Sequence, residues 1–137
     1  LEDAFFEKKI SPISSLRPDY LEKFPNNKVN IVRKIKTLTM GDLFEKNEIT
    51  EVDFLKIDCE GLDTSIIKTI NFEKYKINFL SVEFLDPYAD FINKKNNDIK
   101  SVHQLFFSSE MYNELKRNFE LLDHDKFAFL LVNKKIY

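Results

Sequence analysis

Carboxylates stand at the ends of two apolar segments of the chain, each of which is expected to form a β-strand. Asp58 ends the segment 52–58 and Glu60 follows it, while Glu83 lies near the end of the segment 77–84. In an open α/β sheet, ligands bind beyond the carboxyl ends of the strands. At such a place the three acids could act as a general base, as acceptors from a substrate hydroxyl, or as metal ligands.

The same acids also have a simpler explanation. An acid at a strand end is often only a solvated side chain, and Glu60 could cap the helix that follows. However, strand, helix and strand follow one another here in the order of a βαβ unit, so Asp58, Glu60 and Glu83 should converge on one edge of the sheet. Because acids that perturb one another cluster at functional sites, the functional interpretation is favoured.

Four other side chains have weaker claims to chemistry. Lys56 lies within an apolar strand, so it is either buried with a partner or reaches solvent at a sheet edge. Cys59, between two acids, should have a raised thiol pKa and be a small buried side chain rather than a nucleophile. His103 and His124 lack the spacing of metal ligands, so ordinary surface or boundary positions are expected for both.

Composition limits the classes of protein to consider. The 137 residues suit a single domain, 1–137, and a chain that is 43% hydrophobic and 14% aromatic can bury a core. A net charge of -2 with both signs mixed argues against a nucleic-acid-binding surface. The sole cysteine, Cys59, excludes an intrachain disulfide and favours a reducing, cytoplasmic location. No apolar run approaches the roughly 18 residues of a membrane span.

The hydrophobic pattern predicts an α/β fold. Segment 52–58 is nearly all apolar at its centre, so it is expected to be buried on both faces, as in a parallel sheet. The other expected elements are, in chain order, an irregular segment 1–16, a helix 18–23, a turn 25–27, a strand 28–38, a helix 40–47 capped by Thr39, a helix capped by Asp63 or Thr64 with Ile66, Ile67 and Ile70 on its apolar face, a strand 77–84, a long connection 86–107, a helix 109–118, and a hairpin of strands 119–122 and 127–132.

The residues around the first two acids resemble the signature of a known family. The segment Lys56-Ile57-Asp58-Cys59-Glu60-Gly61-Leu62-Asp63 is similar to the K-I-D-x-E-G-x-E signature of FkbM-type methyltransferases. The segments 14–16, 39–43 and 77–83 resemble that family's S-S-L segment, its T-L-D-D-L segment and its strand ending in V-E. The resemblance covers residues 12–133, with Gly41 in place of an acid and Asp63 in place of the longer glutamate.

This resemblance implies a fold, a reaction and roles for residues. The fold would be α/β, a partial Rossmann-like class I methyltransferase sheet with an antiparallel hairpin at one edge. The reaction would be methyl transfer from S-adenosylmethionine to a hydroxyl of a sugar or another small molecule. Asp58 would be the general base, Glu60 and Glu83 would orient the acceptor or offset the sulfonium charge, and Asp58 and Gly61 would contact the cofactor.

The chain lacks a loop that a complete methyltransferase of this kind would need to bind its cofactor. The chain has only two glycines, Gly41 and Gly61, and so has no Gly-rich cofactor loop. Because the first residue, Leu1, is not Met, we expect the C-terminal portion of a longer methyltransferase domain, inactive alone and unable to bind the cofactor tightly. A piece of this kind would expose a strand edge, through which it is expected to self-associate.

Two alternatives stay open at this point. One is a metal-dependent enzyme, such as a hydrolase, that uses Asp58, Glu60 and Glu83 as oxygen ligands for Mg²⁺ or Mn²⁺. The other is a non-catalytic interaction fragment that pairs its exposed sheet edge with another chain.

Overall fold

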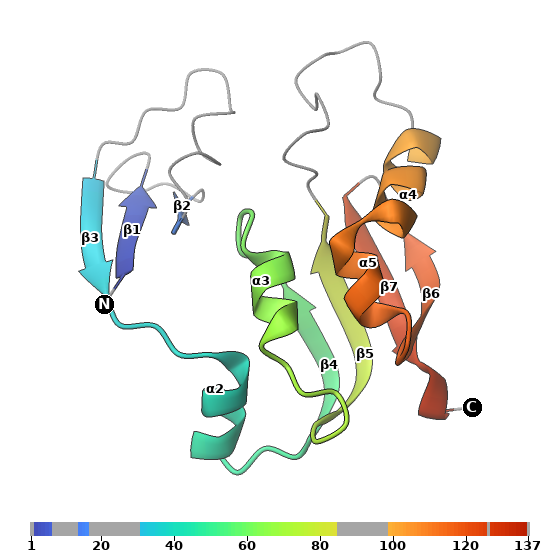
Figure 1. Ribbon diagram of the computed structural model, residues 1–137, viewed down its shortest axis with the longest axis horizontal. Helices are drawn as coiled ribbons and strands as arrows, with labels where there is room; N and C mark the ends of the chain where they lie inside the picture. The colour runs from blue at the N-terminus through green and yellow to red at the C-terminus, as the bar shows by residue number, and fades with distance from the viewer. Residues whose placement is uncertain (1, 7–13, 17–30, 85–98, 126, 137) are drawn as a thin grey trace.

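The computed structural model describes residues 2–6, 14–16, 31–84, 99–125 and 127–136 (Figure 1). These residues form a mixed α/β fold, as the sequence predicts. The elements are β1 (Glu2–Phe6), β2 (Ser14–Ser15), β3 (Ile31–Ile35), α2 (Met40–Lys46), β4 (Glu51–Ile57), α3 (Asp63–Lys68), β5 (Lys76–Glu83), α4 (Ile99–Ser108), α5 (Glu110–Leu115), β6 (Phe119–His124), β7 (Ala128–Asn133) and the 3-10 turn η1 (Lys134–Ile136).

The larger sheet contains four strands in the order β4-β5-β7-β6. β4 and β5 are parallel, with Ile57 opposite Val82, and β7 is antiparallel to both β5 and β6. β4, β5 and β6 therefore point in the same direction, and their carboxyl ends share one edge of the sheet. The predicted hairpin is confirmed as β6 and β7, and the predicted pair of parallel strands as β4 and β5.

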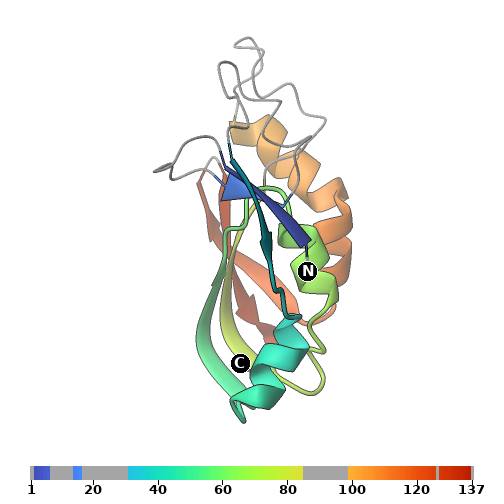
Figure 2. The same cartoon turned by 90° about the vertical axis from the view of Figure 1, so that its left-hand side faces the viewer.

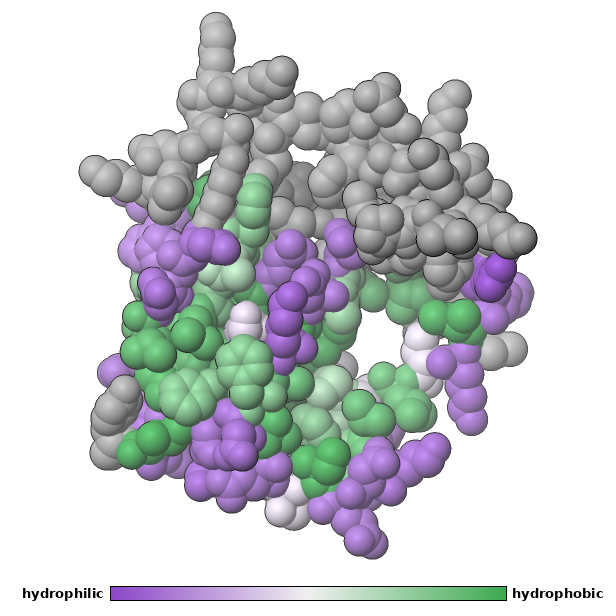
Figure 3. Space-filling model, turned by 180° about the vertical axis from the view of Figure 1, so that it is seen from behind, coloured by the Kyte–Doolittle hydropathy of each residue, from purple (hydrophilic) through white to green (hydrophobic). Residues whose placement is uncertain are grey.

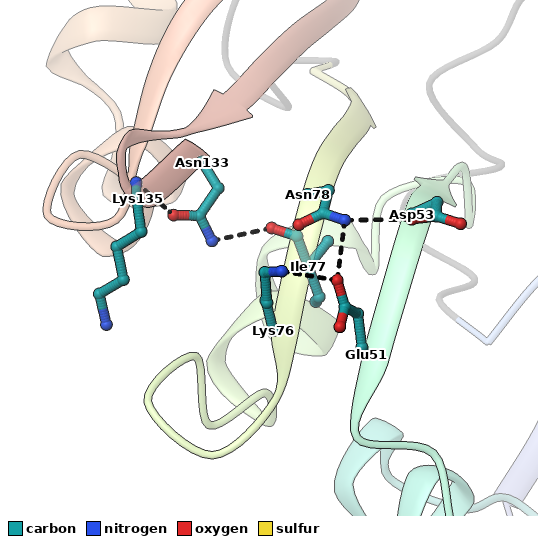
Figure 4. Close-up of polar contacts among 7 residues, drawn as sticks. All are labelled: Glu51, Asp53, Lys76, Ile77, Asn78, Asn133 and Lys135. Carbon is teal, nitrogen blue, oxygen red and sulfur yellow. Dashed lines mark hydrogen bonds and ion pairs between the residues drawn. The ribbon is translucent and has the colours of Figure 1, made fainter. Parts of the chain in front are cut away.

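Polar contacts join three strands near the amino end of β5 (Figure 4). The Asn78 side-chain amide donates to Glu51 Oε1 and Asp53 Oδ1 on β4, at 3.2 and 3.1 Å. On the other side of β5, the buried amide of Asn133 on β7 donates to the Ile77 carbonyl at 2.9 Å. These contacts tie β5 to both neighbours, which helps to hold the strand ends in place.

Local sequence explains where two of the helices begin. The Thr39 hydroxyl accepts the N–H of Asp42, and the Asp42 carboxylate accepts the N–H of Thr39, so the predicted cap is a complete capping box. Ser109 caps α5 by accepting the N–H of Tyr112 at 3.1 Å. Both caps depend on residues three apart, which makes them visible in the sequence.

The helix after β4 begins differently from the prediction. Its cap residue is Leu62, which makes no side-chain capping bond, so the expectation that Asp63 or Thr64 caps α3 was wrong. Asp63 is the first residue of the helix, and its carboxylate faces back to the preceding loop. The apolar face of α3 is confirmed, since Ile67 and Ile70 are buried.

Helices α3, α4 and α5 cover one face of the sheet (Figures 1 and 2). Leu80 and Leu131 of the central strands are fully buried, as is Phe106 of α4. The rings of Phe106 and Phe129 stack with their centroids 3.8 Å apart, which fixes α4 against β7. Burial of side chains of this size contributes roughly 1.5–3 kcal/mol each to folding.

The opposite face of the sheet differs from the sequence prediction. Phe54 and its register partner Phe79 are 56% and 36% exposed, so the expectation that 52–58 is buried on both faces was wrong. Phe79 alternates with the buried Leu80 and therefore points away from the helices. Figure 3 shows apolar side chains gathered on this face. β4 is an edge strand of the four-stranded sheet. In the described ranges, no layer of helices covers the face of the sheet on which Phe54 and Phe79 lie.

Two segments that were predicted as irregular or connecting contain regular structure. Within 1–16, β1 pairs antiparallel with β3, opposing Glu2 to Ile35 and Phe6 to Ile31. The pairing partner lies about thirty residues away in the sequence, which local patterns cannot show. Residues 99–107, within the predicted connection 86–107, belong to α4, where Val102 and Phe106 are buried one turn apart.

One predicted strand is shorter in the structure, and several predicted elements lie outside the described residues. The predicted strand 28–38 is confirmed as the shorter β3. The predicted helix 18–23, the turn 25–27 and the connection before residue 99 lie outside the described residues. Across the ranges that the structure describes, no helix is both long enough and apolar enough to cross a bilayer.

Candidate functional site

The predicted acids come together at the carboxyl edge of the sheet. Glu83 is the last residue of β5, and Asp58 comes directly after Ile57, the last residue of β4. Because Ile57 lies opposite Val82 in parallel register, Asp58 and Glu83 occupy neighbouring positions at the strand ends. Glu60 follows in the loop after β4. The convergence that the sequence predicts for the three carboxylates is confirmed.

The pKa of Glu83 is strongly raised. Burial raises the pKa of Glu83 to about 7, and further upward contributions come from the negative charges of Asp58, Glu60 and Asp63 and from a hydrogen bond to Asp58. The Oε2 atom of Glu83 is buried and has no hydrogen-bond partner among the described residues. Since buried polar atoms are normally paired, this oxygen is suited to a ligand group that can donate a hydrogen bond.

The loop between β4 and α3 has a constrained backbone. Gly61 adopts φ 90° and Glu60 adopts φ 49°, a region that non-glycine residues rarely occupy. The Asp63 carboxylate accepts the N–H of Cys59 at 3.1 Å and the N–H of Gly61 at 3.3 Å, which closes the loop on itself. Asp63 is 4% exposed, and this burial raises its pKa although the backbone donors oppose the shift. The loop therefore holds Asp58 and Glu60 in fixed positions.

Lys56 supplies the positive charge of the site. Its Nζ lies 2.8 Å from Asp58 Oδ2, and the two side chains are 60% and 39% exposed. Of the two interpretations left open by the sequence, the structure supports the one in which the ammonium reaches solvent at a sheet edge. The hydrogen bond to Asp58 is the main cause of the raised pKa of Lys56. An exposed pair of this kind adds little to stability, but it orients Asp58.

Cys59 is exposed, so the expectation of a small buried side chain was wrong. It lies in the loop beyond the end of β4 rather than within the strand, and the core does not reach it. The expected direction of its pKa is confirmed: partial burial raises the pKa of the thiol, and the nearby acids add to the shift. The thiol is therefore a weak nucleophile near neutral pH.

The structure gives no support to a carboxylate metal centre at this edge. In the part of the chain that the structure describes, no group of three or more His, Cys, Asp and Glu side chains is arranged to hold a metal ion. Asp58 is instead paired with a cation, Lys56, and Glu83 has a pKa at which it is partly protonated.

Comparison with known proteins adds the family. The family model of the methyltransferase FkbM domain matches residues 4–121. The chain belongs to the FkbM methyltransferase family. Neither the curated proteins nor the solved structures contain a match. The matched residues include Asp58, Glu60, Gly61 and Glu83, so the resemblance seen in residues 56–63 is confirmed at the level of the family.

Sequence reasoning missed two features of this FkbM domain. One is the loop-closing role of Asp63, which sits where the family signature has a glutamate and was assigned only as a possible helix cap. The other is the proximity of His103 and His124, whose ring centroids lie 4.5 Å apart. The acid at the signature position was a usable signal for the first, but no local pattern signals the second.

Proposed function

We propose that this chain carries the acceptor-binding edge of an S-adenosylmethionine-dependent O-methyltransferase that acts on a hydroxyl of a sugar or another small molecule. Membership of the FkbM family supports methyl transfer. The observation that supports this site most directly is that Asp58 lies beside Glu83, whose pKa is raised to about 7. A carboxyl group with a pKa near the working pH is well suited to exchange a proton with a substrate hydroxyl.

The charged and polar groups at this edge suit both the sulfonium methyl donor and the acceptor hydroxyl. Asp58 and Glu60 bring negative charge to this edge, and Asp63 and Glu83 add to it when they are ionised, which would favour a sulfonium donor beside them. The unpaired Oε2 of Glu83 can accept a hydrogen bond from the acceptor hydroxyl. Gly61 adopts φ 90°, a conformation that residues with side chains rarely adopt, and so allows the sharp course of the loop beside these acids. S-adenosylmethionine would supply an electrophilic methyl group.

The chemistry asked of this chain is to position the acceptor and remove a proton. The acceptor oxygen would take the methyl group as the bond from that group to sulfur breaks, and the task of this chain would be to hold the oxygen in line with that bond. The hydroxyl proton passes to a carboxylate, for which Asp58 is the first choice and Glu83 the second. Glu60 orients the acceptor or offsets the sulfonium charge. The products are a methyl ether and the neutral thioether of the donor.

We propose further that different parts of the polypeptide bind the acceptor and the methyl donor. The 137 residues contain no Gly-rich turn, the element that such enzymes use to approach the methionine and adenosine parts of the cofactor. We therefore propose that this chain is the C-terminal portion of a methyltransferase domain and that a further portion holds most of the donor.

The test is methyl transfer by the full-length protein from labelled S-adenosylmethionine to monosaccharides and small alcohols. The expected result is a labelled ether, with the rate strongly reduced in Asp58→Asn or Glu83→Gln. Glu120→Gln, which removes an exposed carboxylate on β6, is the matched control and should keep the wild-type rate. Labelling of amines only, or no labelling of any acceptor, would reject O-methyl transfer.

A further inference from the structure

The only two histidines of the chain meet in the folded structure. His103 lies on α4 and His124 ends β6, and their ring centroids are 4.5 Å apart with the planes tilted by 33°. Both are half-buried, so the predicted boundary positions are confirmed, but the two residues are not independent of each other. The packing of Phe106 on Phe129 brings α4 onto the hairpin and thereby brings the two rings together.

The tautomer of His124 follows from its hydrogen bond. Its Nδ1 atom lies 3.1 Å from the backbone oxygen of Asp125, and a carbonyl oxygen can only accept. Nδ1 must therefore carry the hydrogen, which leaves Nε2 of the neutral ring with a free lone pair. Metal-binding histidines typically have this arrangement, in which one ring nitrogen donates to a carbonyl and the other faces the metal.

Neighbouring rings restrict the movement of both imidazoles. The Phe129 ring lies parallel to that of His124, with 5.5 Å between centroids and 14° between planes. The Phe107 ring meets that of His103 edge to face at 4.6 Å. Rings that are already held in place lose little conformational entropy when they bind a ligand.

The carboxylate of Asp125 adds negative charge next to this pair. Its Oδ1 atom accepts the N–H groups of Phe127 and Ala128, both at 2.7 Å, which holds the carboxylate in the hairpin turn beside His124. A cation beside His124 would therefore experience a favourable field from this exposed acid.

We propose that His103 and His124 together bind one divalent transition-metal ion of the zinc or copper type through their ring nitrogens. A metal–nitrogen distance of about 2.1 Å places each ring centre about 3.2 Å from the metal, so two imidazoles about 90–109° apart have centres about 4.5–5.2 Å apart. The observed 4.5 Å lies at the short end of this range. Imidazole nitrogen suits Zn²⁺, Cu²⁺ and Ni²⁺ rather than Mg²⁺ or Ca²⁺.

The site has two protein ligands and is therefore open. Among the described residues no third His, Cys, Asp or Glu side chain completes a metal-binding group, which leaves positions on the metal for water or another ligand. His124 ends β6, at the same edge of the sheet as Asp58 and Glu83, because β4, β5 and β6 run in the same direction.

The test is calorimetric titration of the full, untagged chain, stripped with a chelator, with Zn²⁺ and separately with Mg²⁺. We expect one Zn²⁺ per chain and no Mg²⁺ binding at this site. His103→Gln and His124→Gln should each weaken Zn²⁺ affinity by roughly tenfold or more, since even the loss of an outer-shell partner costs metal sites that much. Gln104→Ala, an exposed change beside His103, should bind Zn²⁺ as the wild type does.

A spectroscopic measurement needs no variant and covers the case in which a variant unfolds. The paramagnetic resonance spectrum of the wild type with one equivalent of Cu²⁺ should show coupling to two imidazole nitrogens. Three outcomes would overturn the proposal: no Zn²⁺ binding by the wild type, unchanged binding in both histidine variants, or a copper spectrum without imidazole nitrogen. Each would leave the pair as a packing contact between two rings.

Discussion

Asp58 and Glu83 lie side by side at the carboxyl ends of two parallel strands, one position beyond the register pair Ile57 and Val82. The two acids differ in environment. Asp58 is paired with Lys56 at 2.8 Å, whereas Glu83 is half-buried, has one unpaired carboxyl oxygen among the described residues, and has a pKa of about 7. Glu83, with its raised pKa, can therefore exchange a proton near neutral pH.

In the methyltransferase proposed above, Asp58→Asn should keep the fold and lower the rate of methyl transfer. The side chain is nearly isosteric, but an amide cannot take up the hydroxyl proton, and a general base contributes roughly 10²–10⁴-fold. Glu60→Gln should cost less if Glu60 only orients the acceptor. The measurement is the steady-state rate together with the affinity for the methyl donor, and the loss in rate should be much larger than any loss in that affinity. Wild-type activity in Asp58→Asn would remove Asp58 from the mechanism.

Stability should fall as the pH rises, because of Glu83. Its pKa in the folded state is raised from 4.5 to about 7, so between these values the folded chain holds more of this proton than the unfolded chain does. The free energy of unfolding should therefore decrease across that interval. Glu83→Gln is neutral at every pH and should lack this contribution.

Denaturation in urea at several pH values checks this expectation. The gain in stability of Glu83→Gln over the wild type should grow as the pH rises from about 4.5 to about 7. Asp63, whose pKa burial also raises, acts in the same direction but is present in both chains and cancels in the comparison. A difference between the two chains that does not vary with pH would contradict the assignment, and Glu120→Gln serves as the control.

Asp63→Ala should destabilise the fold and disturb the site together. The change removes the acceptor of the N–H groups of Cys59 and Gly61 from a nearly buried position, and donors left unpaired cost about 1–3 kcal/mol. Thermal unfolding measures the loss, and Ser65→Ala, an exposed change on the same helix, is the matched control. Equal stability of Asp63→Ala and Ser65→Ala would show that the loop does not depend on this carboxylate.

The 137-residue chain by itself should not bind S-adenosylmethionine tightly. The reason is the absence of a Gly-rich turn, whose close backbone approach residues with side chains do not easily permit. Isothermal titration of the isolated chain should show no binding in the submicromolar range. Tight binding with one donor per chain would refute the proposal that a further portion of the domain holds most of the methyl donor.

The isolated chain should self-associate through β4, which stays a prediction from the sequence. β4 ends its sheet, and Phe54 at its centre is 56% exposed, so an unpaired edge of the described sheet adjoins apolar surface. Light scattering should give a mass above that of one chain. Phe54→Lys should lower that mass, whereas Leu122→Lys, a comparably exposed change on β6, should not. A single-chain mass at high concentration would count against it.

The sequence by itself determined those features that depend on neighbours along the chain. The capping box of Thr39 and Asp42 needs only residues three apart, and the hairpin and the strand-end acids follow from local alternation of apolar and polar residues. The segment 56–63 was also enough to indicate the family, because a signature is a local pattern.

The tertiary structure alone decided the features that depend on distant partners. Phe54 is apolar, but its exposure depends on what lies beside β4, and β1 exists because β3 pairs with it. The raised pKa of Glu83 comes first from burial in the fold and then from the charge of Asp58 at the end of the neighbouring strand. The contact between His103 and His124 requires α4 to pack on the hairpin. In each case the deciding free energy comes from burial or charge across the fold, which local sequence does not encode.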